Sequence, residues 1–416
     1  MPGACLVSVR AALLGYDDLV GRVRAAKPAL SRFAIVWFLS LVLLALTALG
    51  GTASVRASTR ASDAALKRAL GALVAMPGGP PGAVAVVQRG HSVALYRAGV
   101  ADLRTGRPIR ASDHMRVASV SKAFSGAVAL SLVDRGRLSL NDTIGKLLPW
   151  LPQAWWPVTL RQALNHTSGL PDYTGSSAFQ AAFAGALHAT PPPPWLLAFV
   201  AGRRLVFKPG SRYSYSNSDN IVVGLMVQAV TGRSFERELA RLVLRPLGLR
   251  QTSLPAGFGM PSPYLHGYDF PDPIRSDLSS AASAAWLWTS GGIVSTPADL
   301  NRFIRGYVGR ALFSRRVQSQ QLRFVAGHSE PIGPGANSAG LGIFRYRTRC
   351  GTVYGHTGNF FGYTQFAAAT LDGRNSVTVS VSEQLNQTYT GQRLAVFKRL
   401  RAAEETAVCA ALAEAR

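Results

Sequence analysis

The chain has 416 residues, 48% of them hydrophobic, and a formal net charge of +24. That length suits one large domain or two closely packed subdomains. The basic residues stand singly, without a block of like charge, a zinc-finger spacing or an RNA-binding signature, so we do not expect nucleic acid as a partner. The positive net charge instead favours a generally basic protein surface that faces an anionic cell wall or membrane.

An apolar run, Phe33–Leu49, follows several basic residues between positions 22 and 32. The run is long for the core of a signal peptide and slightly short for a membrane span. Small residues at Gly51-Thr52-Ala53 are typical of a cleavage site, whereas the preceding basic residues would hold the N-terminus in the cytoplasm. We therefore expect residues 1–60 to comprise a cytoplasmic tail, a signal peptide or membrane anchor, and a linker. The rest would be exported: periplasmic, secreted or anchored to the outer face of the cytoplasmic membrane.

The first elements of the exported part are a helix and a hairpin. Ser62–Met76 has the pattern of an amphipathic helix and ends at a proline- and glycine-rich breaker. Ala83–Gln88 and Ser92–Ala98 flank Arg89-Gly90-His91 and predict two paired strands.

The next stretch, Ser119-Val120-Ser121-Lys122, reads S-x-x-K and precedes an apolar helical run, Ala123–Val133. The spacing places Ser119 at a helix N-terminus with Lys122 one turn on and on the same face. A serine hydroxyl needs a base to attack at neutral pH, and a desolvated lysine can serve as that base. Alone, the pattern fits a capping serine and a solvated lysine equally well.

The middle of the chain, about residues 138–323, is mainly helical in pattern. Predicted helices are Val158–Leu164, Asn220–Val230, Phe235–Val243 and Ala298–Val308. The loop His166–Leu170 follows the first of them, and we place it at the edge of a cleft.

The last part of the chain has the pattern of several strands followed by a C-terminal helix. Predicted strands are Leu341–Arg347, Gly351–His356, Tyr363–Thr370 and Ser376–Ser382, followed by a helix from Thr390 to about Ala413. Strands at both ends with helices between them predict an α+β fold: an antiparallel sheet built from both chain ends and flanked by helices, with a mainly helical second subdomain. Residues 61–416 would form this domain, with a cleft where the two parts meet.

Two further motifs follow Ser119 in order, Tyr215-Ser216-Asn217 and His356-Thr357-Gly358. With them the chain resembles the serine β-lactamase and penicillin-binding protein family, whose signature is S-x-x-K, then Y-x-N, then K/H-T-G. The arrangement is similar to class C β-lactamases and is closest to serine D-alanyl-D-alanine carboxypeptidases.

The resemblance implies an acyl-enzyme formed on Ser119. It assigns shared base duty to Lys122 and Tyr215, with the pKa of the phenol lowered by the neighbouring ammonium group. Asn217 would hold Lys122 or the substrate amide. His356 stands where class C β-lactamases have lysine and would give positive or hydrogen-bonding support to the tyrosine and to a substrate carboxylate. Because histidine titrates near neutrality, we expect this exchange to make activity more dependent on pH.

Substrate binding is assigned, also by resemblance, to Thr357, Gly358 and Asn359. Gly358 would let the substrate backbone lie against the strand without a Cβ in the way. The backbone N–H groups of Ser119 and Asn359 would form the oxyanion hole.

Trp286 lines the acyl pocket in one interpretation and belongs to the core in another. Arg345 or Arg347 is the candidate cation for a substrate carboxylate, although the residue directly after the G-L-G-I stretch is phenylalanine rather than arginine. Cys350 and Cys409 form a candidate disulfide, and the resemblance implies a bond between a strand and the last helix.

The predicted function is therefore an exported serine hydrolase, most simply a D-alanyl-D-alanine carboxypeptidase acting on peptidoglycan stem peptides, with β-lactams as inhibitors or substrates. The alternatives are a class C-like esterase or β-lactamase acting on another small acyl donor and, more remotely, a non-catalytic wall-binding protein. No G-x-S-x-G elbow or H-E-x-x-H helix occurs, and the seven histidines are dispersed, so we expect no metal or other cofactor.

Overall fold

The computed structural model describes residues 59–268 and 275–413. The apolar run at 33–49, on which the export prediction rests, lies outside the described residues. Within the described ranges, no helix combines the length and the apolar character needed to cross a bilayer.

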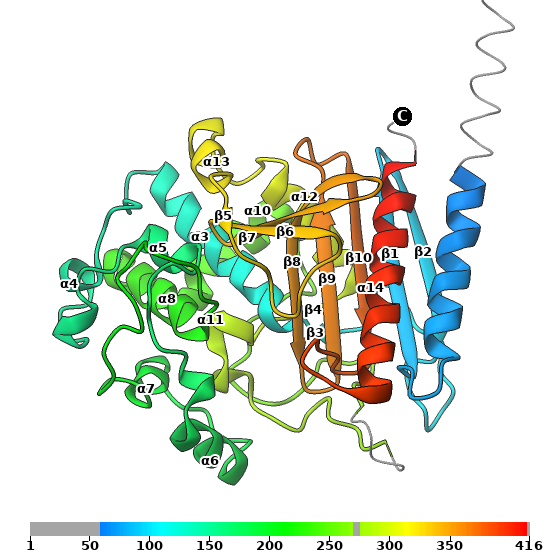
Figure 1. Cartoon of the computed structure of the whole chain (residues 1–416), viewed down its shortest axis with the longest axis horizontal. Helices are drawn as coiled ribbons and strands as arrows, with labels where there is room; N and C mark the ends of the chain where they lie inside the picture. Colours follow the sequence, from blue (N-terminus) through cyan, green and yellow to red (C-terminus); the bar gives the residue numbers. More distant parts are fainter. Residues whose placement is uncertain (1–58, 269–274, 414–416) are drawn as a thin grey trace, which may run out of the picture. The chain divides into compact units, whose positions relative to one another are not determined.

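An eight-stranded sheet, antiparallel throughout, forms the centre of the fold (Figure 1). In spatial order its strands are β2 (Ser92–Gly99), β1 (Gly82–Arg89), β10 (Asn375–Val381), β9 (Tyr363–Ala369), β8 (Gly351–Phe360), β7 (Ile343–Thr348), β6 (Ala336–Gly340) and β5 (Val325–Ala326). Because β1 pairs with β10, the two ends of the domain meet in the middle of one sheet. The predicted antiparallel sheet built from both chain ends is confirmed.

Helices cover both faces of the sheet, which explains why every residue of β1 is buried. A helix over residues 59–74 and the C-terminal helix α14 (Gly391–Leu412) lie side by side over one face (Figure 1). Alternate β1 side chains pack in the core beneath them, whereas Val84 belongs to the core on the opposite side. That second face receives α12 (Pro297–Val308), whose first turn is capped by the Thr296 hydroxyl.

A helical lobe lies between the two groups of strands in the sequence. Its helices are α3 (Ser121–Asp134), α4 (Ile144–Leu147), α5 (Leu160–Leu164), α6 (Ser177–Gly185), α7 (Pro193–Ala198), α8 (Asn217–Thr231), α9 (Phe235–Leu239), α10 (Arg245–Leu247), α11 (Trp288–Gly291) and α13 (Arg315–Gln321). A short ladder of β3 (Met115–Arg116) and β4 (Val294–Ser295) connects it to the sheet.

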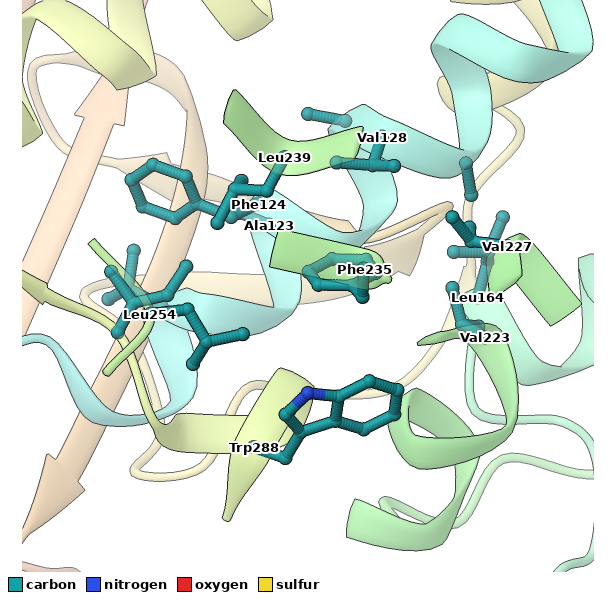
Figure 2. Packing of buried hydrophobic residues seen from close by; sticks show 14 of the residues in the cluster. Ala123, Phe124, Val128, Leu164, Val223, Val227, Phe235, Leu239, Leu254 and Trp288 are labelled. Carbon is teal, nitrogen blue, oxygen red and sulfur yellow. The ribbon is translucent and has the colours of Figure 1, made fainter. Parts of the chain in front are cut away.

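Helix α3 is the centre of this lobe, since 12 of its 14 residues are buried. A helix that is apolar all round has no stable place at a surface. Phe124 and Val128 of α3 contribute to the same buried cluster as Val223 of α8 and Phe235 of α9 (Figure 2). The residues that begin α3 therefore belong to a helix that is anchored in the core of the lobe.

Some element boundaries differ from those predicted. Helix α8 begins at Asn217 rather than Asn220, because Ser216 is extended and the chain turns directly after it. The predicted helix Phe235–Val243 is instead α9, a π-helical turn over Ala240–Leu244 and then α10. Strand β8 continues through the third motif to Phe360.

Cys350, in the turn between β7 and β8, is disulfide-bonded to Cys409 of α14, with the two Cα atoms 5.1 Å apart. This is the strand-to-last-helix pairing that the resemblance implied. It ties the closing helix to the half of the sheet that carries the third motif.

Candidate active site

Ser119 lies in a single 3₁₀ turn, η2 (Ala118–Val120), directly before α3. The residue before it, Ala118, has φ +48°, a left-handed conformation that a side chain with a Cβ adopts only under constraint. Two contacts impose it: the Val117 N–H donates to Ile293 O at 3.0 Å, and the Val120 N–H donates to Val117 O at 3.1 Å. Strained backbone beside a partly exposed hydroxyl is typical of a functional site.

Lys122 is 1% exposed, and its Nζ has three hydrogen-bond partners. Nζ lies 2.8 Å from Asn217 Oδ1, 2.7 Å from Ser290 O and 3.1 Å from Ser119 Oγ. Helices α3, α8 and α11 each supply one side of this arrangement. The structure therefore brings Ser119, Lys122 and Asn217 together, as the order of the motifs predicted.

Burial lowers the pKa of Lys122 to about 7, against the opposing influence of Asp172, Glu330 and Asp219. Near neutrality a large fraction of this amine is thus uncharged. Asn217 Oδ1 and Ser290 O can only accept, so they take both N–H donors of a neutral amine. The remaining lone pair then faces Ser119 Oγ, which is the geometry that a general base requires.

Asn217 is held in one orientation by groups that the sequence did not single out. Its Nδ2 donates to Asp172 Oδ2 at 3.0 Å and to Thr174 Oγ1 at 3.1 Å. Asp172 also accepts from the Thr174 backbone N–H, so its carboxylate is fixed. This arrangement settles which end of the Asn217 amide faces Lys122.

Tyr215 lies against the lysine, with Lys122 Nζ 4.9 Å from the centre of its ring. Burial raises the pKa of Tyr215 well above its usual value, although the nearby Ser119 hydroxyl opposes the shift. The phenol oxygen is buried and makes no hydrogen bond of standard geometry. The prediction that a neighbouring ammonium lowers this pKa is therefore wrong: Tyr215 is a neutral phenol that can donate a proton.

The loop His166–Leu170, expected at the cleft edge, places His166 directly behind Tyr215. The two rings are 4.4 Å apart, and His166 Nδ1 lies 2.8 Å from Asp219 Oδ2. Burial lowers the pKa of His166 to about 3 and raises the pKa of Asp219 well above its usual value, so burial disfavours charge on both. His166 supports the tyrosine ring as an uncharged platform.

His356 lies on β8 but does not act as predicted. It is 1% exposed, its Nδ1 is 2.5 Å from Thr357 O, and its ring meets the Phe344 ring edge to face. Burial, with the Lys122 charge, lowers the pKa of His356 to about 3. The expectation that this histidine titrates near neutrality is therefore wrong, and so is the positively charged form of the support expected from it, because an imidazole sealed from water stays neutral.

The rest of the third motif shapes the site through the backbone. The Thr357 hydroxyl is buried and donates to Pro331 O at 2.5 Å. A Cβ on Gly358 would lie 2.7 Å from Ser119 N and from Val117 O. Gly358 thus lets β8 press against the turn that carries Ser119, rather than leaving room for substrate backbone as we had expected. The Asn359 side chain donates to Leu385 O at 2.9 Å.

A cavity of about 200 Å³ opens at Ser119. It is lined by Ala118, Ser119, Thr174, Phe179, Phe183, Tyr215, Asn217, Leu287, Ser290, Gly291, Glu330, Asn359, Phe360 and Asn386. Both Ser119 and Asn359 are among these residues, so the oxyanion-hole prediction is compatible with the geometry. The lining also includes a carboxylate, Glu330, which the sequence did not point to.

Two predicted binding residues do not line this cavity. Trp286 is 1% exposed and packs edge-on against Phe179 and Phe183, so it belongs to the core behind the cavity wall. Arg345 Nε donates to Ser338 Oγ at 3.0 Å, and its guanidinium covers the Phe324 ring. Its proposed contact with a substrate carboxylate is therefore not supported, and no arginine or lysine occurs among the described residues that line the cavity.

Residues 66–400 match the family model described as Beta-lactamase, which is more than half of the chain. The chain belongs to the beta-lactamase family. The family and the fold predicted from the sequence are thus confirmed.

Among curated relatives, a D-aminopeptidase of Cereibacter sphaeroides is 32% identical over 215 residues, which are 50% of this chain and 40% of the relative. The chain thus spans about two fifths of the length of that relative. A penicillin-binding protein of Bacillus subtilis is 23% identical over 313 residues, 71% of this chain and 66% of the relative.

Among solved structures, a D-stereospecific amidohydrolase from Streptomyces sp. is 30% identical with a TM-score of 0.68, covering 77% of this chain and 94% of its own. A D-amino acid amidase from Ochrobactrum anthropi SV3 has a TM-score of 0.71 at 22% identity, covering 83% of this chain and 98% of its own. The second likeness concerns the fold alone.

Proposed function

We propose that this protein is an acyl-enzyme amidohydrolase that cleaves amide bonds next to a D-amino acid, with Ser119 as nucleophile. The observation that carries the proposal is the environment of Lys122: two acceptors occupy both N–H donors of the neutral amine and leave its lone pair facing Ser119. The names of the D-aminopeptidase and D-stereospecific amidohydrolase relatives support the substrate class.

The reaction follows from these positions. Lys122 takes the Ser119 proton as Oγ bonds to the substrate carbonyl carbon, and the oxyanion forms where the backbone N–H groups of Ser119 and Asn359 are expected. As the C–N bond breaks, the leaving nitrogen receives a proton from the neutral Tyr215 phenol, and the proton on Lys122 restores it. Water then attacks the ester with Lys122 again as base, which releases the acid and frees Ser119.

A second candidate is the D-alanyl-D-alanine carboxypeptidase predicted from the motifs. The penicillin-binding protein relative favours it. The lining of the cavity does not, because a terminal carboxylate would meet Glu330 rather than a cation there. An esterase or β-lactamase activity would use the same acyl-enzyme.

Labelling and product analysis together test these proposals. Fluorescent penicillin should label the wild type and not Ser119→Ala, and D-phenylalanine amide should release ammonia faster than diacetyl-Lys-D-Ala-D-Ala releases D-alanine. An absence of any adduct at Ser119 would refute the acyl-enzyme. Faster release of D-alanine would select the carboxypeptidase.

We further propose that the enzyme acts outside the cytoplasm, on the strength of the apolar run Phe33–Leu49 and the basic residues before it. Fusion of alkaline phosphatase after residue 60 tests this. Active phosphatase is expected, whereas an active cytoplasmic reporter fused at the same place would contradict export.

A further inference from the structure

Glu330 is the one carboxylate among the described residues that line the cavity. Its carboxylate lines the wall near Ser119, yet it makes no hydrogen bond or ion pair with any residue in the described ranges. The side chains of Asn217 and Asn359, which also line the cavity, both have protein partners, whereas the neutral phenol oxygen of Tyr215 has none. A partly buried carboxylate without a partner is costly, so its presence points to a ligand.

The segment that carries Glu330 is held on both sides by buried hydrogen bonds. Pro331 O accepts from Thr357 Oγ1 at 2.5 Å and from Ser329 Oγ at 3.1 Å. Ser329 Oγ in turn accepts from the Tyr346 hydroxyl at 3.1 Å. The backbone around Glu330 is therefore fixed against β7 and β8, which keeps this residue at the cavity.

The electrostatic surroundings favour a cation as that ligand. Burial raises the pKa of Glu330 above its usual value, Asp172 adds to the shift, and His328 and Lys122 oppose it. Lys122 cannot serve as the missing partner, because its hydrogen bonds go to Ser119, Asn217 and Ser290. No arginine or lysine lines the described part of the cavity, so a substrate that carries its own positive charge would supply the partner that Glu330 lacks.

We propose that Glu330 binds the free α-ammonium group of an amino-acid amide whose carbonyl carbon lies at Ser119. The contact selects substrates with an unblocked amino terminus over N-acylated ones. This inference rests on the proposed amidohydrolase function and names the substrate class of the same site. The aromatic wall formed by Phe179, Phe183 and Phe360 faces the same cavity, so a phenylalanine side chain suits the probe.

The test compares three p-nitroanilides that differ only at the α-carbon: D-phenylalanine, N-acetyl-D-phenylalanine and 3-phenylpropionic acid. For the wild type we expect kcat/KM for the free amine to exceed that for the other two by about 10- to 100-fold, the range of a hydrogen bond to a charged group. In E330Q we expect kcat/KM for the free amine to differ from that for the other two substrates by no more than about threefold. E330D keeps a carboxylate and should restore part of the wild-type preference.

Controls separate the contact with substrate from an effect on the catalytic lysine. Glu405→Gln removes a carboxylate on α14 that pairs with Arg349 away from the cavity, and it should keep the wild-type ratio. The rate of Ser119 acylation by fluorescent penicillin is also measured in E330Q. A rate like that of the wild type shows that the variant is folded and still forms the acyl-enzyme. An unchanged substrate ratio in E330Q, or an equal loss on all three substrates, would overturn the assignment of Glu330 while leaving the amidohydrolase proposal intact. Failure of acylation in the wild type would instead overturn the proposed function.

Discussion

The two walls of the catalytic cavity use their motifs in different ways. On the helical wall, the side chains of Ser119, Lys122 and Asn217 face one another within 3.1 Å, and Lys122 has a pKa of about 7. On the sheet wall, the side chains of His356 and Thr357 are buried and bonded to backbone oxygens.

The two walls therefore have different roles: one supplies reactive side chains, and the other supplies the shape of the site. The helical wall supplies the groups that exchange protons, whereas β8 supplies backbone and, at Gly358, the absence of a Cβ. Both walls therefore carry complete motifs, but only the lysine of the helical wall, Lys122, has a pKa near neutrality, whereas the pKa of His356 on the sheet wall is about 3. Four substitutions test this division, from the largest expected effect to the smallest.

Replacing the base should have the largest effect. Lys122→Met keeps an unbranched side chain but removes the amine, and we expect the rate of Ser119 acylation to fall by about 10²–10⁴-fold, the usual contribution of a general base. Stopped-flow measurement with fluorescent penicillin gives this rate. Lys146→Met, on an exposed helix end, is the matched control and should retain the wild-type rate. Retention of more than a tenth of the rate in Lys122→Met would remove the lysine from the mechanism.

Gly358→Ala tests whether the sheet wall acts through shape. The added Cβ would lie 2.7 Å from Ser119 N, so the turn or the strand must shift. A displacement of this kind near a nucleophile should lower acylation by about 10- to 100-fold. Gly71→Ala, where a Cβ meets open space, serves as the control. Wild-type rates in Gly358→Ala would show that the close approach is not needed.

Asp172→Asn should move a pKa rather than abolish activity. The Asp172 carboxylate raises the pKa of Lys122, so its removal should lower that pKa and shift the rising limb of the acylation rate to lower pH. The asparagine oxygen can take the place of Oδ2 and accept from Asn217 Nδ2, although the NH2 group of the variant then replaces the oxygen that accepts from the Thr174 N–H. A shift to higher pH, or no shift, would contradict this electrostatic role.

His356→Gln should have the smallest effect on the pH profile of activity and a clear one on stability. The pKa of His356 is about 3 when folded and about 6.5 when unfolded, so the unfolded state binds its proton first as pH falls. Between pH 7.5 and 5.0 this one residue should lower the free energy of unfolding by about 2 kcal/mol. Urea unfolding at pH 7.5 and 5.0 should show a weaker pH dependence in the variant. An equal dependence in both proteins would mean that the histidine is not kept neutral.

Much of this architecture could be predicted from local signals. The S-x-x-K spacing and the apolar run after it placed Ser119 and Lys122 on one face, and alternating residues at both ends predicted β1 and β10. Strand β6, Ala336–Gly340, was missed because its residues have little intrinsic preference for strands and are ordered by pairing with β7.

The charge states could not be predicted in the same way, because they depend on burial by residues far away in the sequence. The fold buries the imidazole of His356 and the phenol oxygen of Tyr215, which keeps both groups neutral, and no local pattern indicates this burial. Asp172 and Glu330 lie outside the three motifs, and only the fold brings them to the site. Polar residues next to prolines in loops were the weak signal that could have marked both.

The most direct test of the central claim, that a neutral Lys122 activates Ser119, is the pH dependence of the second-order acylation rate in the wild type and in His356→Gln. We expect both rates to rise with an apparent pKa of about 7 as Lys122 loses its proton. A rate that is flat between pH 6 and 9, or a rising limb that disappears in His356→Gln, would contradict the account.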